Sequence, residues 1–398
     1  MAELTLSVLA VLLAALSLAG YFSGRARAIA TAGGDARGLH SLPNFHGWSA
    51  VLALLLPAAA VLVLWRLTHA DISAGGLILA LLAGVAALAA VVLTTNKETR
   101  ARNRLEMAMK GLLILCSMIA VATTLGIILS MLFEAGKFFS RYSWTNFFFG
   151  TVWRPDFRGN SDLGFLPLLW GTLFVSAIAL AVAVPVGLFA AIYMSEYAGP
   201  RLRSTVKPAI EILAGIPTIV YGLFALVTVG PLLRDWFAQP LGLGTSGSSA
   251  MTAGLVMGVM IIPFVSSLSD DIINAVPQSL RDGSLGLGAT KSETIRQVVL
   301  PAALPGIVGA VLLAASRAIG ETMIVVLGAG AAAKLSLNPF EAMTTMTVKI
   351  VSQLTGDTDF AAPETLVAFA LGLTLFVLTL GLNILALIIV RKYREQYE

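Results

Sequence analysis

The sequence predicts an all-α polytopic membrane protein, and two observations carry this prediction. Hydrophobic residues make up 57% of the 398 residues and charged residues only 12%, and the mean hydropathy is +0.87. A soluble domain of this size does not need so much apolar sequence to build its core. Apolar segments of about 20 residues also recur, and each is long enough to cross about 30 Å of hydrocarbon as a helix. These segments lie near residues 4–22, 47–66, 74–95, 108–133, 167–194, 209–232, 250–269, 303–329 and 367–390.

The connections between these segments differ in their content of basic residues, and this difference predicts the orientation in the membrane. Lys and Arg are in excess in alternate connections, namely 24–46, 96–110, 195–208 and the C-terminal tail. Because basic connections stay on the cytoplasmic side, we expect the C-terminus in the cytoplasm and the N-terminus outside. The net charge of +4 is modest and is explained by this topology, so it does not indicate a nucleic-acid partner.

Residues 1–95 are expected to form a three-span N-terminal extension, and the basic stretch 96–110 a cytoplasmic linker to the six-span core of residues 111–398. The first apolar segment resembles a secretory signal, because Ala26-Arg27-Ala28 offers a small-x-small cleavage pattern. Nothing basic precedes that segment and arginines follow it, so we interpret it as a retained span, with cleavage as the alternative. The three histidines lack metal-ligand spacing and Cys116 is the single cysteine, so neither a metal site nor a disulfide is predicted.

Two of the outer connections have a distinctive composition. The connection 134–166 is dense in aromatic residues, which predicts an interfacial belt, a docking surface for a solute-binding protein, or both. The polar rim of such a surface would consist of Arg154, Asp156, Arg158 and Asp162. The connection 330–366 contains the moderately apolar stretch Met343–Leu354, which polar residues interrupt, so we expect a re-entrant or lid helix there.

The polar connection 270–302 carries the signatures of two short helices. Pro277 suits the first position of a helix, and Gly288 can take the left-handed conformation that ends one. Residues Thr290–Glu293 have the spacing of a capping box, in which the Thr hydroxyl and the Glu carboxylate satisfy reciprocal backbone donors. We therefore expect an exposed elbow over residues 277–301, made of a short helix, a glycine turn and a second short helix.

Two charged residues, Arg317 and Glu321, lie inside the apolar segment 303–329, where ionisable side chains are costly. Four residues apart, they are predicted to project from one helix face. Mutual neutralisation is one interpretation, but an apolar pair would avoid desolvating two charges, so a role in a transport pathway is favoured. A guanidinium matches the oxygens of phosphate, and a carboxylate can accept the proton of a protonated phosphate. Thr218 and Tyr221, which follow a Gly-Ile-Pro break, are expected either to line the same path or to serve helix packing.

The spacing within the elbow carries a resemblance to a known family. Gly288 is followed after nine residues by Val298 and then by Leu300-Pro301, in which the proline disfavours helical geometry at the residue before it. The preceding Asp282-Gly283-Ser284 keeps the acid and the small residues of a Glu-Ala-Ala motif. Together with residues 214–222 and 315–323, this pattern resembles the permease subunits of bacterial phosphate-specific ABC importers, which carry the EAA coupling loop.

The resemblance covers roughly residues 105–398 and implies that the elbow is the cytoplasmic coupling loop. It also implies that Arg317 and Glu321 act in translocation, in the bacterial inner membrane. The implied partners are a homologous permease, an ATPase dimer and a periplasmic phosphate-binding protein, with ATP and Mg bound by the ATPase.

No constellation of catalytic residues is apparent, so the chain is not expected to be an enzyme or to bind a cofactor. The stretch 286–292 lacks the glycine directly before lysine that a phosphate-binding loop requires, so no nucleotide site of its own is expected. Three alternatives remain: a permease for another small oxyanion, an ion-coupled secondary transporter, and a non-transporting membrane scaffold.

Overall fold

The computed structural model describes residues 2–69, 71, 73–156, 161–356 and 362–394. Arg158, which the sequence predicts in the polar rim of the outer loop, lies outside the described residues. Contacts divide the chain into two compact units, Met1–Leu125 and Gly126–Glu398. Within the described residues, nine helices are long and apolar enough to cross a membrane, which confirms the predicted number and class of elements.

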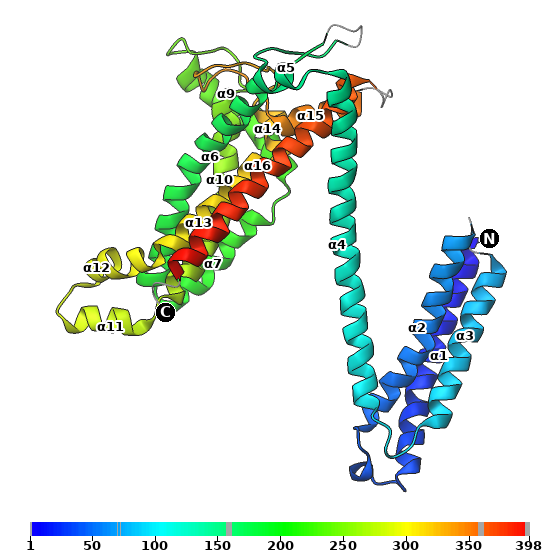
Figure 1. The fold of residues 1–398 in the computed structure, drawn as a ribbon. Helices are drawn as coiled ribbons and strands as arrows, with labels where there is room; N and C mark the ends of the chain where they lie inside the picture. The colour runs from blue at the N-terminus through cyan, green and yellow to red at the C-terminus, as the bar shows by residue number, and fades with distance from the viewer. Residues whose placement is uncertain (1, 70, 72, 157–160, 357–361, 395–398) are drawn as a thin grey trace. The chain divides into compact units, whose positions relative to one another are not determined.

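The first unit is a bundle of three helices, α1 (Ala2–Thr31), α2 (Pro43–Thr68) and α3 (Ala74–Thr94), together with the first part of α4 (Ala101–Arg141). The helices α1, α2 and α3 lie side by side (Figure 1). The approach of α3 to α2 is close, because a Cβ added at Gly84 would lie 2.6 Å from the carbonyl oxygen of Leu54. Contacts divide the chain within α4 rather than at residues 96–110, and the domain boundary expected at that linker stays a prediction.

The second unit begins within α4 and holds the remaining elements. Its outer loop contains α5 (Trp144–Phe149) and the strands β1 (Trp153–Arg154) and β2 (Asp162–Leu163), which pair antiparallel with Trp153 opposite Leu163. Its long helices are α6 (Leu166–Ile192), which continues as the π-helical turn η2 (Tyr193–Tyr197), α10 (Ala250–Ala275), α13 (Leu300–Ile319) and α16 (Pro363–Arg394). Its shorter helices are α7 (Pro200–Ala214), α8 (Thr218–Phe224), η3 (Ala225–Val229), α9 (Gly230–Leu233), η4 (Arg234–Ala238), α11 (Gln278–Gly286), α12 (Lys291–Thr294), η5 (Ile295–Val299), α14 (Met323–Gly328) and α15 (Met346–Gly356).

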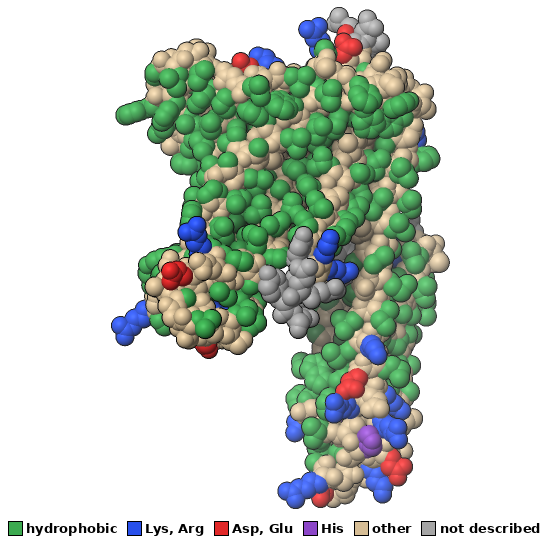
Figure 2. Space-filling view, turned by 60° about the vertical axis from the view of Figure 1, so that its left-hand side comes forward, with side chains coloured by type: hydrophobic (Ala, Val, Ile, Leu, Met, Phe, Trp, Pro, Cys, Tyr) green, Lys and Arg blue, Asp and Glu red, His purple; other side chains and the backbone are tan. Residues whose placement is uncertain are grey.

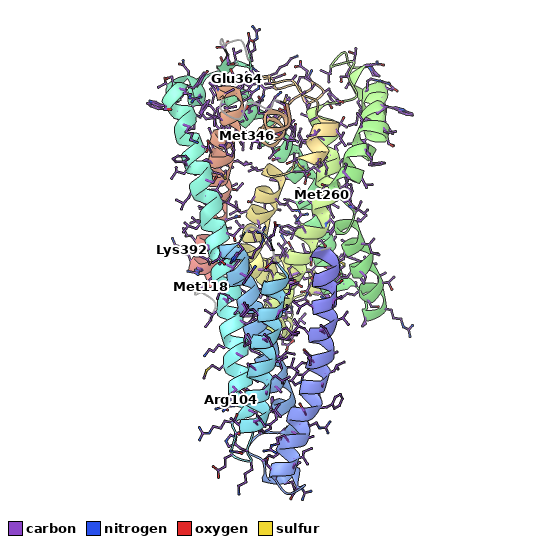
Figure 3. All side chains as sticks on the ribbon, turned by 90° about the vertical axis from the view of Figure 1, so that its right-hand side faces the viewer. Arg104, Met118, Met260, Met346, Glu364 and Lys392 are labelled. Carbon is purple, nitrogen blue, oxygen red and sulfur yellow. The ribbon has the colours of Figure 1, made fainter. Side chains whose placement is uncertain are left out.

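Helix α10 forms the centre of the second unit. In the most apolar 18-residue stretch of α10, 61% of the residues are buried, whereas in the corresponding stretch of α6 with η2 the share is 28%. The two helices approach closely, since a Cβ added at Gly258 would lie 2.9 Å from the carbonyl oxygen of Ala179. Met260 of α10, labelled in Figure 3, is buried in the core that these helices share with α13 and α14. Around this core the surface is largely hydrophobic along the helices, with charged side chains near their ends (Figure 2).

The outer loop packs its aromatic residues into a second core instead of presenting all of them to a membrane interface. Phe138 and Phe147 are fully buried, and they join Trp153 and Phe165 in one cluster. The expected interfacial belt is therefore wrong for these side chains, because they supply the core that holds the loop on the ends of α6 and α16. The Ser161 hydroxyl also donates to the carboxylate of Glu364, at the start of α16 (Figure 3). Trp144 and Phe149 remain exposed.

Two of the expected spans are interrupted. The segment 209–232 is divided at Gly215–Pro217, where α7 ends at Ala214 and α8 begins at Thr218. The proline lacks an N–H group and disfavours helical geometry at the preceding residue, which accounts for this break. The segment 303–329 is divided at Gly320–Thr322, between α13 and α14. The stretch Met343–Leu354 contains a helix, as expected, over Met346–Gly356.

Candidate functional site

The elbow has the predicted architecture of a helix, a glycine turn and a second helix. α11 ends at Gly286, and Gly288 has a φ of +88°, the left-handed conformation expected of it. The Thr290 hydroxyl accepts from the Glu293 N–H at 3.3 Å, and a Glu293 carboxylate oxygen accepts from the Thr290 N–H at 2.8 Å. The predicted capping box is thus confirmed. α11 and α12 project together from one end of the second unit (Figure 1).

The tip of the elbow is exposed and has little packing of its own. Leu287 is 92% exposed, and a Cβ added at Gly283, Gly286 or Gly288 would meet nothing within 4 Å. The Ser284 hydroxyl lies 3.0 Å from that of Thr294, so a hydrogen bond joins the two helices of the elbow. Asp282 accepts from the side-chain amide of Gln278 at 3.0 Å within α11. An exposed tip of this kind is suited to dock against a partner surface.

Two details at the ends of the elbow differ from expectation. Pro277 precedes the first helical residue instead of occupying it, with a φ of −54° and a ψ of 135°. Leu300 is helical, with a φ of −64° and a ψ of −44°, although Pro301 follows it. The reason is the π-helical turn η5, in which the Leu300 N–H donates to the carbonyl of Ile295. This wider turn accommodates the proline, so the helix runs without interruption from Lys291 to Ile319.

Arg317 and Glu321 are not on one helix, so the prediction of a shared helix face is wrong. α13 ends at Ile319, and a Glu321 carboxylate oxygen accepts from the N–H groups of Thr322 and Met323, both at 3.1 Å. Glu321 therefore caps the start of α14, where the first N–H groups of a helix have no partner within it. None of the ion pairs among the described residues joins Arg317 and Glu321.

The Arg317 side chain lies at the surface of the chain. Its guanidinium carbon is 5.7 Å from the centre of the Phe264 ring, within the range of a cation–π contact. Arg317 is exposed, while Glu321 is half-buried. The carbonyl of Glu321 accepts from the hydroxyl of Thr347, at the start of α15, at 2.8 Å. The break after α13 is thus held by hydrogen bonds, and the arginine beside it stays accessible.

Tyr221 bridges the other break. Its hydroxyl donates to the carbonyl of Leu213 at 2.8 Å, across the Gly-Ile-Pro interruption between α7 and α8. Thr218 is the first residue of α8 and is half-buried. This bond gives Tyr221 a structural function, and a direct role of either residue along a path stays a prediction.

The two interrupted helices meet just beyond their breaks. A Cβ added at Gly222 of α8 would lie 2.8 Å from the carbonyl oxygen of Met323 and 3.4 Å from the Cα of Ile324. Because these are backbone atoms of α14, the missing side chain at residue 222 is what permits the contact. The structure therefore brings the break that follows Arg317 close to the helix that carries Thr218 and Tyr221.

A buried acid that sequence reasoning missed lies at the end of α10. Asp270 is fully buried and accepts from Arg203 at 3.0 and 3.1 Å and from Lys207 at 2.9 Å. The hydrogen bond to Asp270 raises the pKa of Lys207. Lys207 therefore stays protonated at neutral pH, and its contribution to stability would be lost only as the pH rises through this raised pKa. The available signal was the acid at the end of an apolar run, with Arg203 and Lys207 four residues apart.

The described residues contain no group of three or more His, Cys, Asp or Glu side chains suited to a metal ion. His46 is buried in α2, and Cys116 is a free, exposed thiol in α4.

Comparisons with known proteins match both units. The family model described as "Binding-protein-dependent transport system inner membrane component" matches residues 183–395. A second model, "Phosphate ATP-binding cassette transporter", matches residues 10–80.

Several curated relatives are similar over most of their length. A "Phosphate transport system permease protein PstC" of Haemophilus influenzae is 30% identical over 319 residues, which cover 76% of this chain and 99% of the relative. The protein of that name in Mesorhizobium japonicum is 36% identical over 242 residues, covering 57% of this chain and 72% of the relative. "Phosphate transport system permease protein PstC 1" of Mycobacterium bovis is 36% identical over 284 residues, covering 63% and 83%.

Proposed function

Because the chain belongs to the family of binding-protein-dependent transport system inner membrane components, we propose that it is the permease subunit of an ATP-driven phosphate importer. The observation that carries this proposal is the similarity to phosphate permeases, which extends over 99% of the Haemophilus influenzae protein. The exposed elbow supports the same function, since its glycine turn is at Gly288, the residue from which the coupling-loop spacing to Val298 and Leu300-Pro301 is counted. The protein is a multi-pass protein of the inner membrane.

The proposed phosphate pathway runs past Arg317. In the part of the chain that the structure describes, this guanidinium makes a contact with the Phe264 ring and is otherwise exposed. Its forked N–H groups are suited to bind two phosphate oxygens at once. An exposed arginine on a membrane helix is costly unless a water-filled path or a partner covers it. A homologous permease would provide that cover and the opposite wall of the pathway.

The elbow is the proposed site at which an ATPase dimer docks. ATP and Mg would be bound by that dimer, and its closure would move the exposed tip as a rigid body and switch the access of the pathway. A periplasmic phosphate-binding protein would deliver phosphate at the outer loop, where Arg154 and Asp162 are exposed.

The decisive experiment is reconstitution in proteoliposomes. We expect ATP-dependent uptake of labelled phosphate by the chain assembled with its second permease, the ATPase and the binding protein, and no uptake by the chain alone. Sulfate in excess should compete poorly, because it is fully deprotonated at neutral pH and has no proton to donate to a carboxylate. Uptake by the chain alone in the absence of ATP would contradict the proposal and support a secondary transporter.

Deletion of residues 1–95, with a starting Met before Asn96, is expected to preserve the orientation of the rest of the chain and much of its phosphate uptake. The basic residues of 96–110 are sufficient to hold this stretch in the cytoplasm. Protease protection in inverted vesicles, with a tag at the C-terminus, measures the orientation. Inverted vesicles expose the cytoplasmic face to the protease, so a tag in the cytoplasm is digested. A shortened chain whose C-terminal tag is protected in the vesicle lumen would contradict the proposed topology, in which the N-terminus lies outside and the C-terminus in the cytoplasm.

A further inference from the structure

The root of the elbow is held by a largely buried ion pair, whose acid comes from a distant part of the chain. Arg281 of α11 donates to one carboxylate oxygen of Glu196 through Nε at 3.2 Å and through Nη2 at 3.1 Å. The two side chains are only 13% and 11% exposed. Glu196 lies in η2, the last turn of α6, so this pair joins α6 to the elbow across 85 residues of sequence.

The same guanidinium also binds the end of α10. It donates to the carbonyl of Val276 through Nη1 and to that of Ile273 through Nη2 at 2.7 Å. The last carbonyls of a helix have no partner within it, and a cation is favourable there. Arg281 therefore connects the elbow helix, the end of α10 and the end of α6 through one rigid, planar group.

The second helix of the elbow contacts the same turn of α6. The Lys291 ammonium donates to the backbone carbonyl of Glu196, and it lies 5.2 Å from the centre of the Tyr197 ring. Both helices of the elbow are thus attached to η2, one on each side of the glycine turn. We call the contacts of Glu196 with Arg281 and Lys291 the α6 clamp.

Helix α6 continues from the clamp to the outer loop. Its outer end is bonded to α5 and to the residue that follows it, since the N–H groups of Phe165 and Leu166 donate to the carbonyls of Phe147 and Gly150 at 2.8 and 3.3 Å. Helix α6 is thus a continuous element that joins the elbow at one end and the aromatic cluster of the outer loop at the other (Figure 1).

We propose that the α6 clamp transmits the movement of the elbow to α6 and through it to the outer loop, so that Glu196 and Arg281 are positioning residues for coupling. This inference rests on the proposed function. The clamp is separable from assembly, because apolar packing of Ala191, Ile273 and Val299 beside it joins α6, α10 and η5 without the charges. Loss of the pair should therefore leave the elements in place but let the elbow move without α6.

The test uses the full reconstituted complex with Glu196→Met, with Arg281→Met and with both changes together, because methionine neither donates nor accepts in place of the ion pair. We expect each variant to assemble in wild-type amounts and to hydrolyse ATP, while the phosphate taken up per ATP falls on the order of tenfold, a typical size of coupling between sites. The double variant should be no worse than either single one, because residues that act as one pair are not additive. The matched control is Asp235→Asn, which removes an exposed ion pair with Arg234 and should leave the ratio unchanged.

A second readout does not require phosphate. In a Cys116→Ser background, a cysteine introduced at the exposed residue Phe149 of α5 reports on the outer loop. We expect a non-hydrolysable ATP analogue to change its labelling rate in the wild-type complex and not in the Glu196→Met complex.

The outcomes separate the two proposals. A Glu196→Met complex with the wild-type uptake ratio and the wild-type labelling response would overturn the clamp. Parallel loss of assembly and uptake in all three variants would also overturn it, since it would show a structural role alone. If the ATP analogue changes the labelling rate at residue 149 in the wild-type complex but the complex takes up no phosphate, the proposed substrate is refuted. The labelling rates of the wild-type and variant complexes then still decide whether the clamp transmits the movement.

Discussion

Replacement of Arg317 by alanine is expected to lower phosphate uptake by about 10- to 150-fold, with little loss of assembled complex. A hydrogen bond to a charged group contributes about 1.5–3 kcal/mol, and the guanidinium of Arg317 is exposed and available for such bonds. Because the side chain is at the surface of the chain, its removal leaves no cavity in the core. Uptake in proteoliposomes, normalised to the amount of complex, gives the effect. Phosphate capture by the separate binding protein should not change.

Two substitutions of Glu321 separate the effect of its charge from its role in capping α14. Glu321→Gln removes the charge but keeps an amide oxygen that can accept from the N–H groups of Thr322 and Met323. Glu321→Ala removes both and should also weaken the start of α14, by about 0.5–2 kcal/mol as for other lost caps. The double variant Arg317→Met with Glu321→Gln should assemble and not transport. Normal phosphate import by that double variant would contradict a role of these charges in the pathway.

Substitution of Gly288 by valine is expected to uncouple ATP hydrolysis from uptake while membrane insertion stays intact. At this residue φ is +88° and a Cβ would meet nothing within 4 Å, so the backbone conformation alone opposes the change. A left-handed conformation costs about 1–2 kcal/mol for an L-residue, and more for a β-branched one. The turn would relax and the exposed tip would point elsewhere, so docking would no longer drive the pathway.

Gly283→Ala is the matched control for this change. Residue 283 lies in the same elbow, is equally open around its Cβ, and has a helical backbone that alanine favours. We expect this variant to keep the wild-type ratio of uptake to hydrolysis. Tight coupling in an assembled Gly288→Val complex would show that the geometry of the turn is not needed.

The sequence was sufficient for features that depend on local chemistry. Length and hydropathy predicted the nine spans, and the spacing of Thr290 and Glu293 predicted a capping box that the structure contains. The end of α13 at Ile319 was missed because the surrounding residues are apolar and resemble a continuous span. The helical geometry of Leu300 was missed because the rule for residues before proline does not consider a π-helical turn.

The ion pairs of the site required the tertiary structure. Glu196 and Arg281 lie in two polar connections, each with ordinary composition, and only the packing of α6 beside the elbow brings them within 3.1 Å. The network around Asp270 likewise joins residues more than 60 positions apart. The spacing of Arg203 and Lys207 places both on one face of a helix, but nothing in the sequence identifies Asp270 as their partner.

The contact of Gly222 with α14 has a consequence for laboratory evolution of this permease. The atoms that a new side chain at residue 222 would meet include the main-chain oxygen of Met323 and the Cα of Ile324, and these remain whatever side chains residues 323 and 324 carry. A library that varies residues 222, 323 and 324 together is therefore expected to yield few functional variants with a side chain at residue 222. The neighbouring Ile219 and Val220 are exposed and open to variation. Under selection for transport of a new anion, we therefore expect substitutions at residues around this contact, while Gly222 itself is retained.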